Sequence, residues 1–395
     1  KHVPIARDVT RSSKKVMKIK KLKSNEHNLT RTLWEQIFNE DSKEFLDYYY
    51  FMKAKDNEIY VIENDQEICS MLHLNPYTLK LEDTQFQGSY IVGVATKPLH
   101  RKKGYMGTLL RQSLSDMYKR KEPFTFLMPA AESIYTPYDF RFVYDQNHTT
   151  LTDVKNIDRY KSVEATFFDC ERISAFYTEN IKKNWQICTL RDSAYYQSLL
   201  LERQSELGGI RMVFEEDKLI GIFTYMMEDG LEIMEPFFLP GYESAMDQSV
   251  AQLKTEKNIS GNVKIYASLI DTQEKKPTIM VRILHLEQFL KTLKVKSGKQ
   301  LHCSFAILDY ILPQNSKVWE IYNDLNSPDT PNVLHVKETE DSEGVLTIGA
   351  LTSFVFGYKT LEEVAKEENV ILTDHLAEEL KKLKPLNRIY LNEVV

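Results

Sequence analysis

The chain has 395 residues, of which 42% are hydrophobic and 27% charged, and its formal net charge at pH 7 is −6. This length is too great for one compact core and predicts two or three domains, while the composition is ordinary for a soluble globular protein. No apolar run reaches the roughly 18 residues of a membrane span, and the negative charge argues against a nucleic-acid coat and favours cationic partners.

The first block of predicted elements ends near residue 155. Residues 1–16 are polar and basic without an apolar stretch, so they are no secretory signal, and we treat them as an extension of unknown origin before Met17. The block then contains an amphipathic stretch, three strands, a helix and a buried strand, at 33–51, 58–63, 67–74, 89–96, 105–120 and 124–128. Two strands joined through a helix predict a mixed α/β layer with a right-handed crossover.

A second block, 156–278, repeats this order of elements. Its hairpin strands, third strand, helix and last strand are predicted at 211–214, 219–226, 231–238, 243–256 and 262–267, which indicates an internal duplication. The loop before its helix reads LPGYESA, with no basic residue and no glycine loop of the first block's kind. We therefore expect the second copy to keep the layers and to lack the ligand site.

The third block, 279–395, is predicted to be an α+β domain of a different kind. Its strands and helices are expected at 279–283, 286–293, 301–308, 317–322, 332–336, 344–349, 361–367 and 374–384. The four cysteines of the chain are far apart and lack the spacing of a zinc site or a disulfide framework. We therefore expect buried thiols, a reducing cytoplasm and no metal site.

The segment with the clearest chemical signal is SYIVGVATKPLHRKKGYMG, residues 89–107. A strand ends at Thr96, and three basic residues followed by Gly104 lead directly into a helix. The first N–H groups of a helix have no intrahelical acceptor, and the helix dipole adds positive potential there. Gly104 lets the backbone approach a phosphate closely, so a pyrophosphate is the expected ligand. An isolated RKKG is more often solvated surface, but its position between a strand and an amphipathic helix favours a binding site.

This loop resembles motif A of the GNAT N-acetyltransferases, which bind the pyrophosphate of acetyl-CoA in this way. The wider pattern, AT-x-P-x-HRKKGYMGTLL followed by FLMPAAESIYTPYDFRF, resembles the Eis-type (enhanced intracellular survival) bacterial acetyltransferases. The resemblance implies a catalytic GNAT domain at 17–155, a degenerate second GNAT domain at 156–278 and a sterol-carrier-like α+β domain at 279–395. Many GNAT loops have glycine or alanine where this chain has Met106, but Eis-type loops carry a bulky apolar residue there.

The resemblance also assigns the cofactor residues. The strand before the loop splays from its neighbour in GNAT proteins, and its free backbone groups, here at Val94 and Thr96, hold the pantetheine arm and the thioester carbonyl. The loop and the start of the helix complete the acetyl-CoA site, with Arg101, Lys102, Gly104, Tyr105, Met106 and Gly107.

Acid and base are assigned on the same basis. Tyr135 matches the family's tyrosine that protonates the sulfur of coenzyme A, a transfer that is uphill by about 2 kcal/mol on reference pKa values. The alternative is a core aromatic residue whose hydroxyl is hydrogen-bonded; Tyr138, beyond Pro137, is expected to pack inward. No histidine–carboxylate pair offers a base, and His100 is expected to be structural. The resemblance implies the terminal carboxylate, here that of Val395, and the apolar, strand-like last residues support a buried terminus.

The predicted reaction is acetyl transfer to a primary amine in a ternary complex, with an aminoglycoside, a polyamine or a lysine-type acceptor. Four carboxylates would favour a multiply charged amine, or are solvated surface: Glu35, Asp41, Glu132 and Glu393. Glu393 is also the alternative base. The rival hypothesis is a non-catalytic acyl-CoA or lipid-binding protein that works through the third block. Family members form homo-oligomers, so we expect one here.

Overall fold

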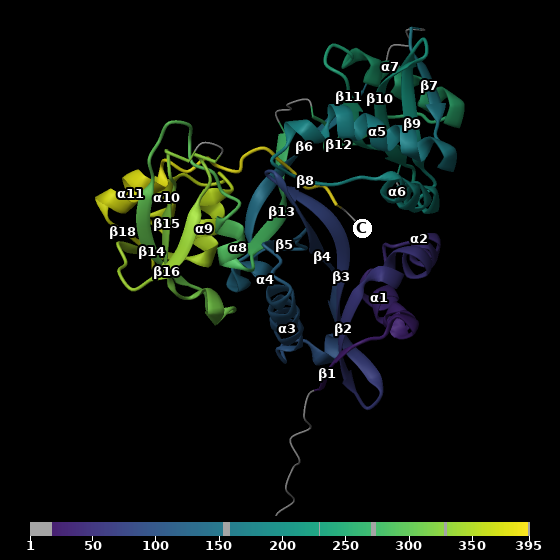
Figure 1. Cartoon of the computed structure of the whole chain (residues 1–395). Helices are drawn as coiled ribbons and strands as arrows, with labels where there is room; N and C mark the ends of the chain where they lie inside the picture. The colour runs from purple at the N-terminus through teal and green to yellow at the C-terminus, as the bar shows by residue number, and fades with distance from the viewer. Residues whose placement is uncertain (1–17, 153–158, 229, 270–273, 328–329, 394–395) are drawn as a thin grey trace, which may run out of the picture.

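The computed structural model describes residues 18–152, 159–228, 230–269, 274–327 and 330–393. They form three lobes that follow one another along the chain (Figure 1). The predicted extension at 1–16 lies outside the described residues. All four cysteines are buried and free, as predicted, and none of the described helices is long and apolar enough to cross a membrane.

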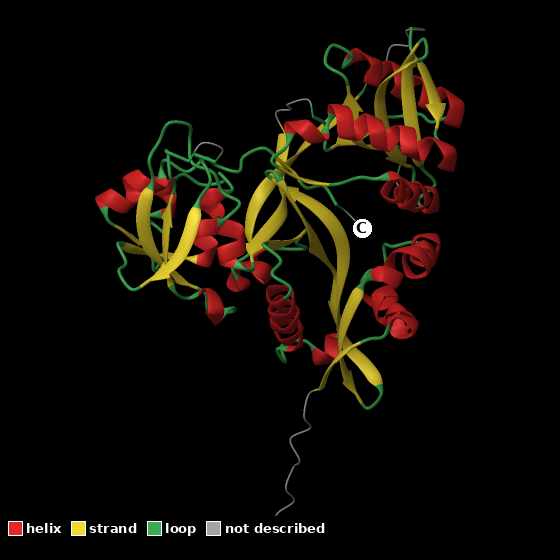
Figure 2. Ribbon diagram, viewed as in Figure 1, coloured by secondary structure: helices red, strands yellow, loops and turns green. Residues whose placement is uncertain are grey.

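The first lobe is a sheet with helices on its faces (Figure 2). Its strands are β1 Lys18–Lys21, β2 Glu58–Asn64, β3 Glu67–Leu81, β4 Thr84–Thr96, β5 Phe124–Leu127 and β6 Arg141–Leu151, and its helices are α1 Arg31–Ile37, α2 Lys43–Tyr48, α3 Tyr105–Lys119 and α4 Glu132–Tyr135. The predicted helical spacing of α3 is confirmed, because the side chains that face the sheet are fully buried: Leu109, Leu110, Leu114 and Met117.

The second lobe repeats this arrangement. Its strands are β7 Lys161–Glu164, β8 Ile187–Thr189, β9 Gly209–Glu215, β10 Lys218–Met226, β11 Glu232–Phe238 and β12 Val263–Tyr266, and its helices are α5 Cys170–Asn180, α6 Ser193–Ser205 and α7 Ser244–Lys257. β9, β10, β11 and β12 pair antiparallel, antiparallel and parallel, as β2, β3, β4 and β5 do. The predicted duplication is therefore confirmed.

The two lobes share one sheet of 14 strands. β13, Glu274–Ile283, lies between β5 and β6 and is antiparallel to both. This strand begins earlier than the predicted 279–283, so the predicted boundary at 278/279 falls inside it. Its first four residues, three charged residues and Pro277, are exposed and resemble a loop, yet they pair with β6. The first lobe is thus completed by a strand that follows the second lobe in the chain.

β3 is also longer than predicted. The sequence pattern predicted its end at Leu74, but the strand continues through Pro76 to Leu81. Pro76 lies between the last pair with β2, at Leu74, and the first pair with β8, at Leu79. Its missing N–H therefore faces a gap between two neighbouring strands, where a proline is tolerated.

The third lobe has its own sheet, with the order β16-β15-β14-β17-β18. Its elements are α8 Leu286–Leu290, β14 His302–Leu308, β15 Val318–Tyr322, β16 His335–Thr339, β17 Gly344–Thr347, α9 Ile348–Val355, α10 Leu361–Val364, β18 Ile371–Leu372 and α11 Asp374–Leu380. The predicted strand at 344–349 was wrong at its end, because the Thr347 hydroxyl accepts the Ala350 N–H and starts α9. The chain then leaves this lobe, and β19, Ile389–Tyr390, pairs with β8 between the first two lobes (Figure 1).

Candidate active site

β4 changes its course shortly before it ends. The register of the β3–β4 pair shifts so that Gly93 and Val94 lie opposite the single residue Leu72. Gly93 has a φ of +58°, and a Cβ at this position would lie 2.4 Å from the Trp34 ring. The positive φ and the close approach of Trp34 both select glycine at this β-bulge.

β4 and β5 diverge from this point. They pair in register at Tyr90 and Phe126, and in the described ranges no strand pairs with the β5-facing edge of residues 91–96. This edge carries the bulge, so it offers free backbone N–H and C=O groups to a ligand that enters between the strands. Thr96 fixes the end of the strand, because its hydroxyl lies 2.8 Å from that of Ser70.

The loop between β4 and α3 is curved toward an open space. Lys102 and Gly104 have φ values of +60° and +79°, a backbone path that turns successive N–H groups to one side. The first hydrogen bond of α3 runs 3.0 Å from the Thr108 N–H to the Gly104 carbonyl, so the N–H groups of 105–107 have no intrahelical acceptor. A Cβ at Gly104 would meet no atom within 4 Å. The loop can therefore admit an anion to the backbone itself.

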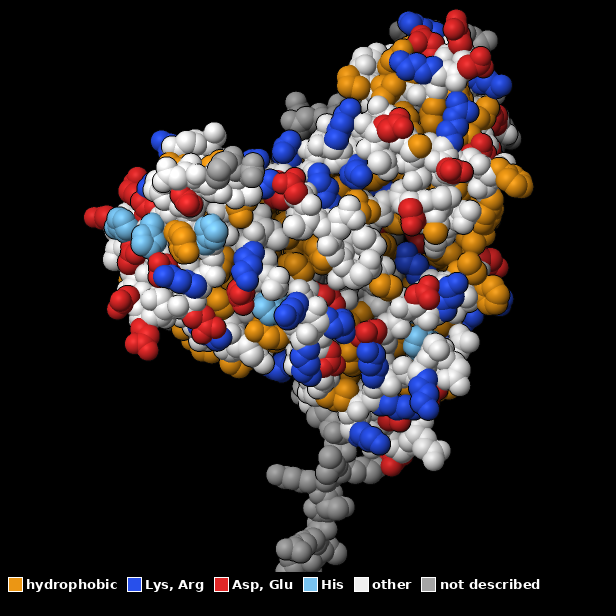
Figure 3. Space-filling view, viewed as in Figure 1, with side chains coloured by type: hydrophobic (Ala, Val, Ile, Leu, Met, Phe, Trp, Pro, Cys, Tyr) orange, Lys and Arg blue, Asp and Glu red, His pale blue; other side chains and the backbone are white. Residues whose placement is uncertain are grey.

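Charge adds to this geometry. Arg101, Lys102 and Lys103 are exposed, and the dipole of α3 adds positive potential at the same end. The Arg101 Nε donates to the Thr96 carbonyl at 3.3 Å, which ties the loop to the end of β4. Figure 3 shows Lys and Arg side chains, mixed with acidic ones, over the part of the molecule where α3 lies.

The next two positions of the predicted loop site pack under the helix. The side chains of Tyr105 and Met106 are half-buried against the apolar cluster below α3. Gly107 is buried, and a Cβ there would lie 2.2 Å from the Tyr138 hydroxyl oxygen. The absence of a side chain at Gly107 thus makes room for Tyr138, a packing reason that the sequence pattern does not reveal.

Tyr135 lies at the end of α4, in an apolar setting that leaves its hydroxyl free. Its side chain is only 7% exposed, and its ring contacts that of Phe140 edge-on. Burial raises the pKa of Tyr135 to about 12, so the hydroxyl is protonated at neutral pH. Within the described residues this hydroxyl has no hydrogen-bond partner, which is uncommon for a buried tyrosine and leaves it available to a ligand.

Tyr135 belongs to a group of aromatic residues near the C-terminal segment. Burial, followed by the charges of Tyr77, Glu393 and Tyr135, raises the pKa of Tyr90. Burial and the nearby Glu393 carboxylate likewise raise the pKa of Tyr77. The ring of Tyr77 lies 6.3 Å from those of Tyr90 and Phe126, so these aromatic residues form one cluster.

A cavity of about 290 Å³ opens beside this group, between the first two lobes. It is bounded by residues after α2, the middle of β3, one side of α6 along most of its length, and the C-terminal segment. Two cationic side chains line it, those of Lys53 and Arg203, against five carboxylates: Asp56, Asp192, Glu202, Glu235 and Glu393. The cavity is therefore suited to a cationic guest.

Of the predicted acceptor residues, Glu393 lines this cavity. Glu35 is exposed on α1 and pairs with Arg31 at 2.8 Å, and Asp41 accepts the Trp34 indole N–H at 2.6 Å. Burial raises the pKa of Asp41. Glu132 is exposed at the start of α4, and none of these three carboxylates lines the cavity. Val395 lies outside the described residues.

Sequence reasoning missed the second-lobe side of the cavity. Glu202, Arg203 and Tyr195 come from α6, a helix that was not predicted although Tyr196, Leu199 and Leu200 are buried at helical spacing. That spacing was the available signal. The isolated arginine before this helix, Arg191, carries no motif at all, and its surroundings become visible only in the fold.

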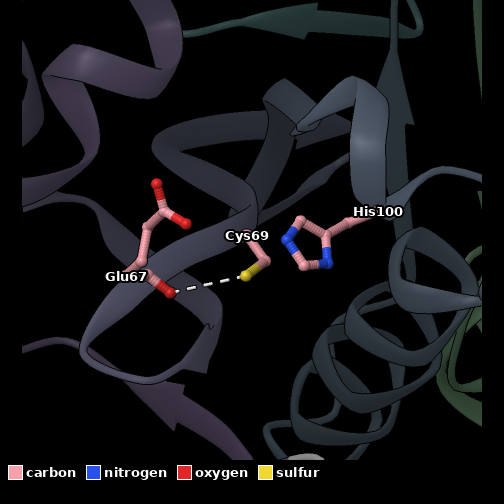
Figure 4. Close-up of side chains that lie close together, drawn as sticks. All are labelled: Glu67, Cys69 and His100. Carbon is pink, nitrogen blue, oxygen red and sulfur yellow. Dashed lines mark hydrogen bonds between the residues drawn. The ribbon is translucent and has the colours of Figure 1, made fainter.

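Glu67, Cys69 and His100 also lie close together next to the basic loop (Figure 4). One ligand atom from each falls within 4.8 Å of the others. However, the Glu67 carboxylate already binds the Lys97 ammonium group, and burial raises the pKa of the Cys69 thiol. A metal would need that thiol as a thiolate, so the donor set fits a metal poorly.

The site matches a known family. Residues 18–143 match the acetyltransferase (GNAT) domain family and residues 286–392 match the sterol carrier protein domain family. The chain therefore carries a GNAT acetyltransferase domain, of an N-acetyltransferase class that uses acetyl-CoA, and a sterol carrier protein domain near its C-terminal end. No curated protein matches the chain in sequence.

Solved structures show the same fold over almost the whole chain. A probable N-acyltransferase of Enterococcus faecalis V583 superposes with a TM-score of 0.77 at 19% identity, covering 93% of this chain and 98% of that one. A GCN5-related N-acetyltransferase of Anabaena variabilis gives 0.73 at 15% identity, with coverages of 93% and 97%. Eis1 of Mycobacterium abscessus gives 0.67 at 14% identity, with coverages of 93% and 96%. The predicted fold, two GNAT units followed by a sterol-carrier-like domain, is confirmed.

Proposed function

We propose that the chain transfers an acetyl group from acetyl-CoA to a primary amine bound in the cavity between the first two lobes. One observation carries this proposal. The open edge of β4, the unpaired N–H groups at the start of α3 and the free hydroxyl of Tyr135 all belong to one β4–α3–β5–α4 unit. The Tyr90 and Phe126 rings of that unit lie 6.3 Å from the ring of Tyr77, which lines a carboxylate-rich cavity.

Acetyl-CoA would be held along β4 and the loop. Backbone groups at Val94 and Thr96 bind the thioester end and the pantetheine arm. Arg101, Lys102 and the N–H groups from Gly104 onward bind the diphosphate. The open space above Gly104 and the unpaired strand edge support this fit.

The reaction needs one proton donor and one proton acceptor. The neutral amine forms the new C–N bond to the acetyl carbon while the C–S bond breaks, and Tyr135 gives its proton to the departing sulfur. With a pKa of about 12, protonation of a free thiolate would be uphill by about 5 kcal/mol. Tyr135 therefore acts as charge develops on sulfur, held against it by the pocket.

The proton of the amine goes to a carboxylate of the C-terminal segment. Glu393 already accepts from Tyr195 at 2.7 Å and lies 3.3 Å from the Arg191 guanidinium, so its charge is engaged. We therefore keep the predicted α-carboxylate of Val395 as the base and Glu393 as a wall of the acceptor cavity. Residues added after Val395 should lower turnover without unfolding the protein, and a fully active extended form would exclude this base.

The acceptor would be a multiply charged amine. Even with the buried Arg191 that pairs with Glu235 and Glu393, five carboxylates stand against three cations around the cavity, which favours an aminoglycoside, a polyamine or a lysine-bearing peptide. A groove of about 670 Å³ adjoins the cavity through Met52 and presents Phe51, which is 80% exposed, so a bulky acceptor has room to approach.

The test is thiol release from acetyl-CoA by the purified chain with a panel of these amines, with mass spectrometry of the products. We expect a polycationic amine to accelerate release and to gain one acetyl group. Coenzyme A binding without acceleration by any amine would overturn the proposal. Homo-oligomer formation and a cytoplasmic location stay predictions.

A second candidate function belongs to the third lobe. A cavity of about 370 Å³ there has an apolar lining that includes Leu293, Val355 and Leu361, and lysines such as Lys296 and Lys381. Such a lining suits an anionic amphiphile, as the rival lipid-binding hypothesis requires. Binding of a fluorescent fatty acid that Leu361→Glu abolishes, with acetyl transfer unchanged, would support this second function.

A further inference from the structure

The bulge of β4 has a counterpart in the second lobe. The register of the β10–β11 pair shifts so that Glu235 and Pro236 lie opposite the single residue Phe223. Glu235 has a φ of +51°, close to the +58° of Gly93. Glu235 and Pro236 therefore occupy the positions that Gly93 and Val94 occupy in the first lobe.

These two replacements change what the bulge can hold. Pro236 has no backbone N–H, so the donor that Val94 offers is missing. The Glu235 side chain also places a carboxylate at the bulge, where both of its oxygens accept hydrogen bonds from the Arg191 guanidinium at 2.7 and 2.8 Å. A thioester carbonyl would therefore find no backbone N–H donor at this bulge and would face a carboxylate.

The opening between β11 and β12 is filled from within the chain. The Tyr390 hydroxyl of β19 donates to the carbonyl of Ala267, just after β12, at 3.1 Å. On the other side, its ring lies 5.4 Å from that of Phe237 in β11. Tyr390 is 1% exposed, so it closes the gap that the diverging strands β4 and β5 leave open in the first lobe.

Arg191 joins this opening to the acceptor cavity. Its side chain is 1% exposed, and beyond Glu235 its guanidinium lies 3.3 Å from the Glu393 carboxylate. The rings around it are those of Tyr177, Tyr195, Phe237 and Tyr390, at 5.0 to 5.7 Å. One buried cation thus compensates two buried carboxylates, and the loss of such a cation leaves both without a counter-charge.

The segment after β19 is held from the first lobe as well. The Gln146 side chain of β6 donates to the side-chain amide oxygen (Oδ1) of Asn392, and the Tyr195 hydroxyl donates to Glu393. Asn392 and Glu393 are both buried and both line the acceptor cavity. Their position is therefore set by contacts with two lobes at once.

We infer that the cofactor opening of the second lobe has become a socket for the chain's own C-terminal strand, and that Arg191 is the positioning residue that presents Glu393 to the acceptor. The socket stands on geometry alone, and its catalytic consequence rests on the proposed function. The second lobe then contributes to catalysis by shaping the acceptor side of the site.

The test is hydrogen–deuterium exchange of full-length Arg191→Met, read by mass spectrometry on peptides that cover 386–393. We expect exchange at 389–393 to accelerate about 10-fold or more, because the strand loses its buried counter-charge. Arg191→Lys should restore part of the protection. The control is Arg159→Met, which removes an exposed second-lobe arginine bound to Glu215 and should change nothing at 389–393.

Two further readouts separate positioning from general damage. Tyr195→Phe removes one hydroxyl and should accelerate exchange at 392–393 by about 3-fold even if Arg191→Met fails to fold. With an active amine, both variants should raise its KM about 10-fold and leave coenzyme A affinity unchanged. Unchanged exchange at 389–393 in folded Arg191→Met and Tyr195→Phe would overturn the inference. Absence of acetyl transfer in the wild type would overturn the proposed function alone.

Discussion

The first and second lobes have the same strands in the same order. They differ in the loop that precedes the helix, where the first lobe is expected to bind its ligand. Before α3 the loop is long and basic, and its curved backbone leaves the first N–H groups of the helix free. Before α7 the shorter loop carries Glu243, whose carboxylate accepts the Gly241 N–H at 3.0 Å. That N–H, and then the N–H of Glu243 itself, lower the pKa of the Glu243 carboxyl. The second lobe thus satisfies internally the groups that the first lobe leaves for an anion.

The comparison teaches that loss of a ligand site need not disturb the fold. The bulge, the parallel strand pair and the helix are all retained in the second lobe, and only the groups that would face a ligand have changed. Substitutions that make one lobe resemble the other therefore test which groups are needed for cofactor binding and catalysis.

The largest effect is expected from Val94→Pro, which copies Pro236 into the first lobe. The bulge of the second lobe shows that this backbone accepts proline, so the fold should persist while the N–H is lost. Turnover should fall by about 10²- to 10³-fold, as on removal of a donor to a reacting carbonyl. Steady-state kinetics measures this, with Val94→Ala, which keeps the N–H, as the control; equal rates would contradict the assigned role.

The second-largest effect is expected from Tyr135→Phe, which should lower turnover about 10²-fold and leave coenzyme A affinity nearly unchanged. The second lobe has no matching role for a tyrosine, so Tyr266→Phe at the end of β12 serves as the control. Single-turnover kinetics and calorimetry measure the two quantities. If Tyr135→Phe proceeds at the wild-type rate, solvent protonates the sulfur.

The next smaller effect is a difference between the two lobes in how much stability they lose at low pH. His73, which pairs with Val92 next to the bulge, is fully buried, and burial lowers its pKa to about 3. The unfolded chain takes up a proton below about pH 6.5, so stability that is present above this pH is lost as the pH falls toward 3, by up to about 1.4 kcal/mol per unit. The second lobe has Thr224 at this register.

Hydrogen–deuterium exchange, corrected for intrinsic rates, should be measured at pH 7.5 and 5.5. On the change to pH 5.5, opening of residues 89–96 should increase more than opening of residues 232–238. His73→Thr should remove that difference, whereas a change at the exposed His302 should leave it. Equal behaviour of the two lobes in the wild type would show that His73 is not the cause.

The smallest effect is expected from removal of one cation in the loop between β4 and α3. Lys102→Ala should weaken coenzyme A binding about 5-fold, and less at high salt, because an exposed charge is screened. Lys119→Ala, at the other end of α3, should have no effect. Titration calorimetry at two NaCl concentrations checks this, and an unchanged affinity would assign the diphosphate to backbone groups alone.

The sequence was informative wherever local pattern determines structure. The spacing of Leu109, Leu110 and Leu114 predicted α3, and repetition of the same patterns predicted the second lobe. The parts that it did not predict depend on pairing between distant segments. The extension of β3 through Pro76 depends on the gap between β2 and β8, and the surroundings of Arg191 depend on a strand about 200 residues later in the chain.

The insertion of β13 between β5 and β6 sets the order in which the protein can mature during synthesis. Leu151 ends β6, but the strand that separates β5 from β6 begins at Glu274. At about 5–20 residues per second, the ribosome needs on the order of ten seconds to supply it. Until then the nascent acetyltransferase unit exposes two unpaired strand edges, which can pair with other chains. A gene fragment that stops near residue 155 should accordingly give insoluble product, while one that extends past Ile283 supplies the missing strand.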